Sequence, residues 1–200
     1  MRKILLSTVY FISILLIVLM NKLASRWTCW LHLQSDKNWN ISSYKKIIDF
    51  DTLEDGIILI ENLSLKIITQ SMVFLMRENI LPIWENEDNI KGGSFSYKIS
   101  NCFVNNVWKK LCYCLIGNTL HHDENIMKNI NGISISPKKN FCIIKFWLKS
   151  LETIKENKEI TDFINNFIDN NDEEIDDNID PFNIHMICGI DKQICIFRKH

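Results

Sequence analysis

The spacing of apolar and polar residues along the chain predicts strands in some segments and helices in others. Short apolar runs bounded by turns, or apolar residues alternating with polar ones, are typical of strands, whereas recurrence every three or four residues is typical of helices. The strand pattern is found at 26–33, 47–50, 94–99, 132–136, 141–148, 182–188 and 193–197. The helical pattern begins at residues 51–52 and recurs at 104–117 and 151–168, with a helical tendency around 74–78 in the apolar segment 65–79.

The first predicted helix has a recognisable start and an apolar stripe. Either Asp51 or Thr52 can cap its N-terminus, and Glu54 and Asp55 fall in its first turn, where the helix dipole favours acidic groups. The predicted apolar face contains Leu53, Ile57, Ile60 and Leu63. In the helix predicted at 104–117, Trp108 is expected in the core and Gly117 at the C-terminal end.

Strands paired around intervening long helices indicate an α+β domain. Segments 132–136 and 141–148 are joined by a basic turn at 137–140, which predicts a hairpin. Because side chains alternate along a strand, Ile143, Lys145 and Trp147 are expected to share one face. The predicted fold is a curved antiparallel sheet backed by helices on one face.

Composition describes one globular domain with little net charge. The chain has 200 residues, of which 46% are hydrophobic, and a formal net charge of −1. A core of useful size is possible at this length. Extended electrostatic binding along a nucleic acid needs many Lys and Arg residues, so the charge argues against that class of function.

The seven cysteines follow no regular spacing and suggest reduced thiols rather than a disulfide framework. Cys112 and Cys114, followed by His121 and His122, come nearest to a metal-ligand pattern. Two residues separated by one position on a helix point in different directions, so the thiols would not converge. We therefore expect buried cysteines with solvent-facing histidines, and neither a metal site nor a cofactor.

Residues 1–25 differ from the rest of the chain, and the globular domain is expected at 26–200. Segment 4–20 contains no charged residue and reaches the lower length limit of a membrane-spanning helix. Three interpretations remain open: a start that does not belong to the working protein, a membrane anchor facing the cytosol, and a signal sequence for secretion. Of the three, secretion agrees least with a chain that carries seven thiols.

The stretch from Ile80 to Phe95 carries the most distinctive chemistry. Pro82 favours an extended residue before it, and Gly92–Gly93 permit positive-φ bends in a tight connection. Trp84 and Glu85 are thereby presented side by side on a short loop. An indole face attracts cations and a carboxylate accepts hydrogen bonds, so the pair complements guanine, and a methylated, positively charged guanine better still.

The same stretch resembles the central motif of the mRNA cap-binding family, eukaryotic translation initiation factor 4E. The similarity runs from about residue 26 to residue 164 and follows short motifs in a specific order. These are Arg26-Trp27 with Trp30, Trp39, Phe50-Asp51-Thr52 with Glu54-Asp55, Pro82 to Glu85 with Asn89 and Gly92-Gly93, Leu115 to Gly117, Gly132 and Trp147.

The resemblance implies a non-enzymatic, cytoplasmic protein that binds the 7-methylguanosine cap in translation initiation, with about three helices on the convex face of its sheet. Trp39 and Trp84 would sandwich the base, Glu85 would pair with its edge, and Trp147 would contact the methyl group. Lys138 falls on a phosphate-binding position where the family usually has arginine.

Two departures from the family pattern affect the expected partners. The second basic phosphate position falls on Ile143, so Lys145 is expected to substitute, with weaker triphosphate contact. On the convex face, Leu53 remains but Ile57 replaces the tryptophan that binds a short helical motif of the initiation scaffold. Alternatives are therefore a cap-binding repressor that does not engage the scaffold, and a membrane-tethered interaction domain without cap binding.

Overall fold

The structure is a computed structural model, and it describes residues 21–150 and 192–193. The apolar segment 4–20, the helix predicted at 151–168 and the strand predicted at 182–188 lie outside these residues. The strand predicted at 193–197 also lies outside them, except for Gln193. In the described part of the chain, no helix is both long enough and apolar enough to cross a membrane.

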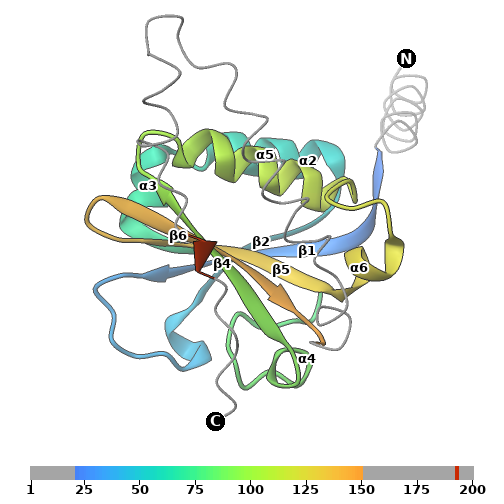
Figure 1. Ribbon diagram of the computed structural model, residues 1–200, viewed down its shortest axis with the longest axis horizontal. Helices are drawn as coiled ribbons and strands as arrows, with labels where there is room; N and C mark the ends of the chain where they lie inside the picture. The colour runs from blue at the N-terminus through green and yellow to red at the C-terminus, as the bar shows by residue number, and fades with distance from the viewer. Residues whose placement is uncertain (1–20, 151–191, 194–200) are drawn as a thin grey trace, which may run out of the picture.

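Seven strands form one antiparallel sheet in the described residues (Figure 1). In spatial order they are β2 (Lys45–Thr52), β1 (Lys22–Leu33), β3 (Ser71–Arg77), β5 (Ile130–Pro137), β6 (Phe141–Leu148), β4 (Gly93–Ser100) and β7 (Lys192–Gln193). The predicted curved antiparallel sheet is confirmed, and so is the hairpin, as β5 and β6. Because β1 begins at Lys22, the sheet includes the residues just before Arg26.

Three helices form a layer on one face of the sheet (Figure 1). They are α2 (Leu53–Asn62), α3 (Leu65–Gln70) and α5 (Val104–Ile116), whereas α4 (Glu87–Ile90) and α6 (Glu124–Asn129) are short and lie outside this layer. A single 3₁₀ turn, η1, spans Ile41–Ser43. Helix α2 starts as predicted: the Thr52 hydroxyl oxygen accepts a hydrogen bond from the Asp55 amide at 3.2 Å.

Side chains on each strand alternate between the two faces of the sheet, and apolar residues cover both. On β3, Val73 and Leu75 join the large core beneath the helices, whereas Phe74 and Met76 join a smaller cluster on the other side. We call these two sides the helix-covered face and the pocket face.

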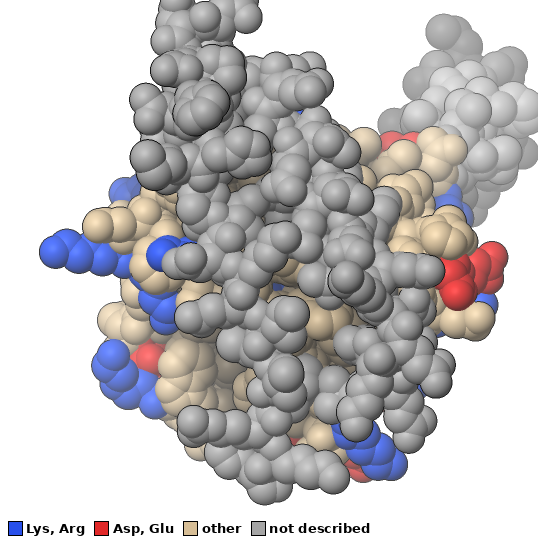
Figure 2. All heavy atoms as spheres, in the orientation of Figure 1, with Lys and Arg blue, Asp and Glu red and all other residues tan. Residues whose placement is uncertain are grey.

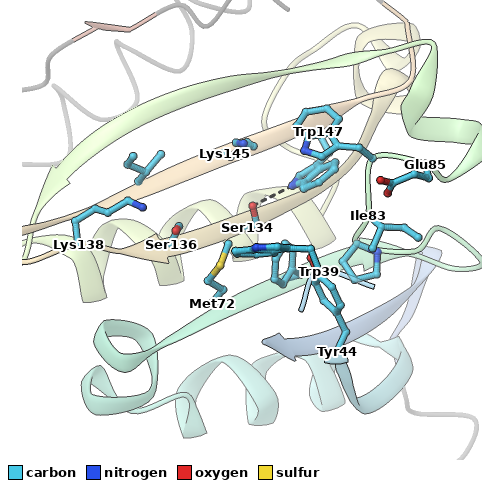
Figure 3. Close-up of a pocket in the computed structure, with 14 residues that line it drawn as sticks. Trp39, Tyr44, Met72, Ile83, Glu85, Ser134, Ser136, Lys138, Lys145 and Trp147 are labelled. Atoms are coloured by element: carbon cyan, nitrogen blue, oxygen red, sulfur yellow. Dashed lines mark hydrogen bonds between the residues drawn. The ribbon is translucent and has the colours of Figure 1, made fainter. Parts of the chain in front are cut away.

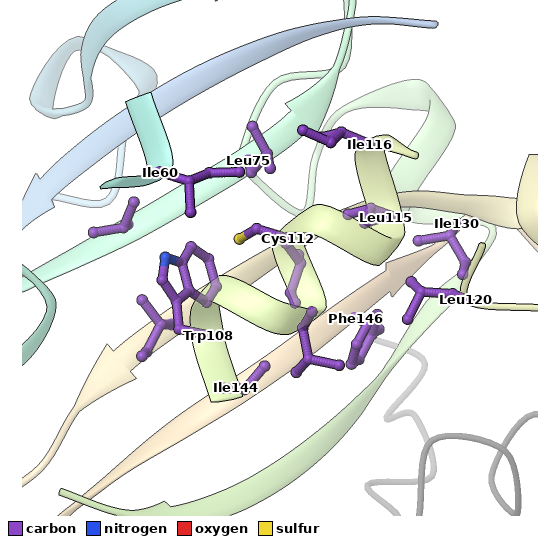
Figure 4. Packing of buried hydrophobic residues seen from close by; sticks show 14 of the residues in the cluster. Ile60, Leu75, Trp108, Cys112, Leu115, Ile116, Leu120, Ile130, Ile144 and Phe146 are labelled. Carbon is purple, nitrogen blue, oxygen red and sulfur yellow. The ribbon is translucent and has the colours of Figure 1, made fainter. Parts of the chain in front are cut away.

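The core of the helix-covered face is built around α5 (Figure 4). Trp108 is fully buried there, as predicted, and packs over the sheet with residues such as Ile144 and Phe146 of β6. Helix α5 contacts β1, β5 and β6 and also packs against α2. In the described part of the chain, this layer covers one face of the sheet and leaves the pocket face uncovered by long helices.

The helical tendency predicted around residues 74–78 is wrong, because this segment forms β3. Both faces of β3 are covered by other residues, so its side chains are apolar at successive positions. A short apolar run of this kind has no period that separates a buried strand from a helix.

The predicted apolar face of α2 is wrong in one position. Ile60 and Leu63 are buried, but Ile57 is 41% exposed. Gly56 faces inward instead, where a Cβ atom would lie 2.7 Å from Cδ1 of Ile116 and 2.9 Å from Cε2 of Phe50. Successive helical residues point about 100° apart, so the inward placement of Gly56 turns Ile57 outward.

A candidate aromatic pocket on the sheet

An open pocket of about 310 Å³ lies on the pocket face (Figure 3). Its volume is at the lower end of the range usual for small-ligand sites, about 300–1,000 Å³. The six residues predicted for ligand binding all line it. The complete lining consists of Trp39, Tyr44, Met72, Phe74, Pro82, Ile83, Trp84, Glu85, Ser134, Ser136, Lys138, Ile143, Lys145 and Trp147.

Trp39 forms one side of the pocket from the loop after β1. Its ring stacks on His32, with centroids 4.5 Å apart and an interplanar angle of 9°. His32 is fully buried, and its Nε2 lies 2.8 Å from the Asn38 carbonyl oxygen, which also accepts a hydrogen bond from Ser43 at 2.7 Å. The supported face of Trp39 is therefore fixed, while the side chain as a whole remains 55% exposed.

A buried asparagine that follows shortly after Trp84 and Glu85 in the sequence fixes the backbone of their loop. Asn89 lies in α4, and its Nδ2 donates to the carbonyl oxygens of Leu81 at 2.9 Å and Ile83 at 2.8 Å. Its Oδ1 accepts a hydrogen bond from Asn131 of β5 at 3.0 Å. These bonds tie the loop to its own helix and to the sheet, so the indole and the carboxylate project from a braced backbone.

The positive-φ bends expected at Gly92–Gly93 are wrong, because the described glycines show none. Gly92 is instead required by close packing. A Cβ atom on it would lie 1.7 Å from the carbonyl oxygen of Leu148 at the end of β6. This contact brings the start of β4 against β6 and closes the loop that carries Trp84.

Trp147 forms the inner wall of the pocket and is 4% exposed. Its Nε1 donates a 2.9 Å hydrogen bond to Oγ of Ser134 on the neighbouring strand β5 (Figure 3). Its ring centroid lies 4.5 Å from that of Trp84, with the planes at 34°. Ile143, Lys145 and Trp147 all face the pocket, which confirms their predicted alternation.

The acidic and the basic side chains of the pocket occupy different parts of it. Glu85 lies at one end and Lys138 at the other, with Lys145 between them near Trp147 (Figure 3). Burial, and secondly the negative charge of Glu85, raise the pKa of the Tyr44 hydroxyl to about 12. The raised pKa keeps the Tyr44 hydroxyl protonated, and thus able to donate a hydrogen bond, to a more alkaline pH than is usual for tyrosine.

On the face shown in Figure 2, the Lys and Arg side chains that can be seen lie in separate groups near the edge. Together with a net charge of −1, this arrangement does not suit long-range binding along a polyanion.

The sequence patterns missed several pocket residues. The lining residues Tyr44 and Met72, and His32, which supports Trp39 from outside the lining, have no local signal that separates them from core residues. Ser134 and Ser136 did carry a signal: they alternate with the buried Ile133 and Ile135, and polar residues at that spacing on a central strand indicate a face that is not core.

The residues considered for a metal site serve structural roles. Cys112 is buried as expected, but Cys114 is only half-buried. The expectation that both histidines face solvent is wrong for His121, which is 6% exposed. Its Nδ1 accepts a hydrogen bond from the amide of Asp123, the N-cap of α6, at 2.9 Å, and its ring stacks on His122. Among the described residues, no group of three metal-ligating side chains occurs.

The fold and the pocket together define a class of protein: an α+β domain with an open sheet that presents aromatic side chains on the side away from its helices. Residues 22–188 match the model of one family in particular, described as eukaryotic initiation factor 4E. The chain belongs to this family, which confirms the resemblance seen in its motifs.

Individual relatives agree with the family match. The chain is 29% identical over 143 residues to the eukaryotic translation initiation factor 4E of Eremothecium gossypii, a match covering 66% of this chain and 64% of that protein. It is 30% identical over 147 residues to the Dictyostelium discoideum factor, covering 69% of this chain and 56% of that protein. The matches thus span less than two thirds of the length of these relatives.

Solved structures share the fold at lower identity. Schistosome eIF4E, solved with m7GpppG and 4E-BP, superimposes with a TM-score of 0.65 at 21% identity, covering 79% of this chain and 86% of that one. Caenorhabditis elegans eIF4E-3, solved with the 4E-binding protein Mextli and a cap analog, gives a TM-score of 0.62 at 20% identity, covering 80% and 88%.

Proposed function

We propose that this protein binds the 7-methylguanosine cap of mRNA and takes part in translation initiation in the cytoplasm, without catalysing a reaction. The observation that carries the proposal is the gathering of Trp39, Trp84, Trp147 and Glu85 in one pocket whose opposite end holds Lys138. Membership of the initiation factor 4E family supports it. A membrane-tethered domain that has lost cap binding would have no need to keep this set together.

The base is proposed to lie between Trp39 and Trp84. Trp39 stacks on His32, and Trp84 contacts Trp147 with the ring planes tilted by 34°. Both Trp39 and Trp84 keep exposed area at the pocket on which a base can stack. Stacking on an aromatic side chain contributes about 1–3 kcal/mol per base. The positive charge of a methylated guanine adds a cation–π attraction of up to about 2 kcal/mol in a desolvated site.

Glu85 is proposed to accept two hydrogen bonds from the N1–H and the N2 amino group of the guanine edge. A bidentate pair of this kind contributes about 1–3 kcal/mol of discrimination between bases. Trp147 is proposed to contact the N7-methyl group, because its buried hydrogen bond to Ser134 fixes its ring against the inner wall.

The phosphates are proposed to extend toward Lys138 and Lys145. An ammonium group attracts phosphate as a point charge but lacks the planar fork with which arginine binds two oxygens. We therefore expect the triphosphate to add less to the affinity than an arginine at position 138 would provide.

Leu53 and Ile57 are proposed to contact a protein partner on the helix-covered face. Ile57 and its neighbour Ile58 are 41% and 60% exposed, so α2 offers an aliphatic surface to a short helical motif. An aliphatic side chain is a weaker anchor than the tryptophan that the family pattern has here. This difference favours a partner with a reduced aromatic requirement over strong engagement of the usual scaffold.

The test is a titration of the full chain with 7-methyl-GTP and, separately, GTP, followed by tryptophan fluorescence. We expect clearly tighter binding of the methylated nucleotide. Glu85→Gln should weaken it by roughly 5- to 150-fold, the equivalent of about 1–3 kcal/mol. Glu87→Gln is the matched control, because Glu87 is an exposed acid two residues further along and does not line the pocket. Equal responses to the two nucleotides, or equal losses in the two variants, would contradict the proposal.

A further inference from the structure

Lys145 places a positive charge on the same aromatic surface that a cationic base would use. Its Nζ atom lies 5.1 Å from the ring centroid of Trp84 and 5.8 Å from that of Trp147. Both distances are within the range in which an ammonium group is attracted to an indole face. In the ligand-free pocket, a cation of the protein itself therefore covers part of the aromatic wall.

The position of Lys145 also gives it access to the anionic end of a ligand. It lies on β6 between Ile143 and Trp147 on the pocket face, and it lies between Glu85 and Lys138 along the pocket (Figure 3). Its cross-strand neighbours are serines, Ser134 on β5 and Ser96 on β4. Small side chains on both sides leave the long lysine stem room to turn along the sheet.

We propose that Lys145 is a displaceable internal cation that couples recognition of the base to recognition of the phosphates. This inference rests on the proposed cap-binding function and adds a specificity-determining residue to it. A methylated guanine that enters the pocket removes the ammonium group from the Trp84 and Trp147 rings, which costs the cation–π contact. If the ligand carries phosphates, the released ammonium group binds them and the cost is offset. If the ligand is a nucleoside, it brings no phosphate to offset the cost.

The consequence is selection for a phosphorylated 5′ end. The pocket discriminates against free methylated nucleosides, which have the right base but no phosphate, because they compete with Lys145 without compensating it. Lys138 alone cannot produce this effect, since it lies at the end of the pocket away from Glu85, whereas Lys145 is the lysine whose ammonium group lies over Trp84 and Trp147. Its removal should weaken phosphate binding only.

Lys145→Met tests the proposal, because methionine keeps an unbranched apolar stem and removes the charge. We expect the affinity for 7-methylguanosine to rise about two- to fivefold, because the base no longer has to break an exposed cation–π contact when it binds. The affinity for 7-methyl-GTP should fall about tenfold or more, the loss of a charge-assisted contact. Lys145→Arg keeps the charge and should preserve the preference of the natural chain for the nucleotide.

Lys98→Met is the matched control. The Lys98 ammonium group lies 4.9 Å from the Phe141 ring centroid, a contact of the same kind, and Lys98 does not line the pocket. This variant should leave both affinities unchanged. If Lys145→Met leaves the nucleoside unaffected, Lys145 is a phosphate contact only and the inference is overturned. If it weakens both ligands, Lys145 supports the base site instead of competing with the base, and the inference is overturned as well. If it strengthens both, Lys145 is a competitor only and the coupling is overturned. If the natural chain binds neither ligand, the proposed function fails and the inference fails with it.

Discussion

Asn89 allows the support of the pocket loop to be measured directly. The side chain is 1% exposed and takes part in three hydrogen bonds, two donated to Leu81 and Ile83 and one accepted from Asn131. A hydrogen bond contributes a net 0.5–1.5 kcal/mol or so, which gives about 1.5–4.5 kcal/mol for the three. Asn89→Ala should therefore lower the free energy of unfolding by about 2–4 kcal/mol, a large share of the roughly 5–15 kcal/mol usual for a domain.

The measurement is urea unfolding followed by circular dichroism. The midpoint should fall while the dependence on urea stays the same, because the surface exposed on unfolding is little changed. Asn125→Ala, at an exposed position in α6, should stay within about 0.5 kcal/mol of the natural chain. The affinity for 7-methyl-GTP should also fall in Asn89→Ala, because the backbone that carries Trp84 and Glu85 loses two attachments.

Asn89→Asp distinguishes hydrogen bonding from simple packing. The two side chains have nearly the same shape, but an ionised carboxylate has no donor and would face two carbonyl oxygens. This variant should be at least as unstable as Asn89→Ala at pH 7 and should recover partly on acidification, when the protonated carboxyl group can donate one bond. If it is as stable as the natural chain at pH 7, the amide is not donating and the reasoning about the loop is refuted.

Three further predictions concern packing, wall geometry and pH. Gly92→Ala should prevent stable folding or lower the free energy of unfolding, measured by thermal denaturation, by more than about 3 kcal/mol. The reason is that a Cβ atom would lie 1.7 Å from a backbone carbonyl oxygen of β6. Ser134→Ala should cost about 1–3 kcal/mol by leaving the buried Trp147 Nε1–H without an acceptor, and Ser134→Thr should restore most of it; equal stability of all three chains would rule this bond out. The Lys46 side chain, hydrogen-bonded to Asp49, lowers the pKa of the Asp49 carboxyl group in the folded protein. The stabilisation from this ionised carboxylate should be present above the unfolded pKa and lost as the pH falls through the folded pKa. Asp49→Asn should therefore flatten the acid limb of a curve of folding stability against pH.

Local patterns predicted the parts of the molecule that depend on local geometry. The alternation of Ile143, Lys145 and Trp147 placed one wall of the pocket correctly, because the period of a strand needs no knowledge of the rest of the fold. The cap of α2 at Thr52 was predictable for the same reason, since the capping bond joins residues three positions apart. The local pattern around Trp39 favoured burial instead, and only the family resemblance placed this exposed residue in the site.

The features that local patterns missed depend on contacts between distant parts of the chain. Gly92 is needed because Leu148 lies against it, and nothing near Gly92 in the sequence reports that contact. The support of Trp39 by His32 depends on a loop folding back over β1. β3 was misjudged because burial on both of its faces removed the alternation that identifies a strand. Local patterns together with the family resemblance therefore predicted which residues line the pocket better than what holds them in position.

The alternation along β6 has a consequence for how this protein can change. Positions 143, 145 and 147 face the pocket, whereas 142, 144, 146 and 148 belong to the core. Ligand preference can thus drift by single substitutions at the odd positions while the even positions preserve foldability. Insertion or deletion of one residue within the strand would exchange the two sets, placing Lys145 in the core and Phe146 in the pocket. Length variation should therefore be confined to the turn at 138–140, where a hairpin can lengthen without altering the register of either strand.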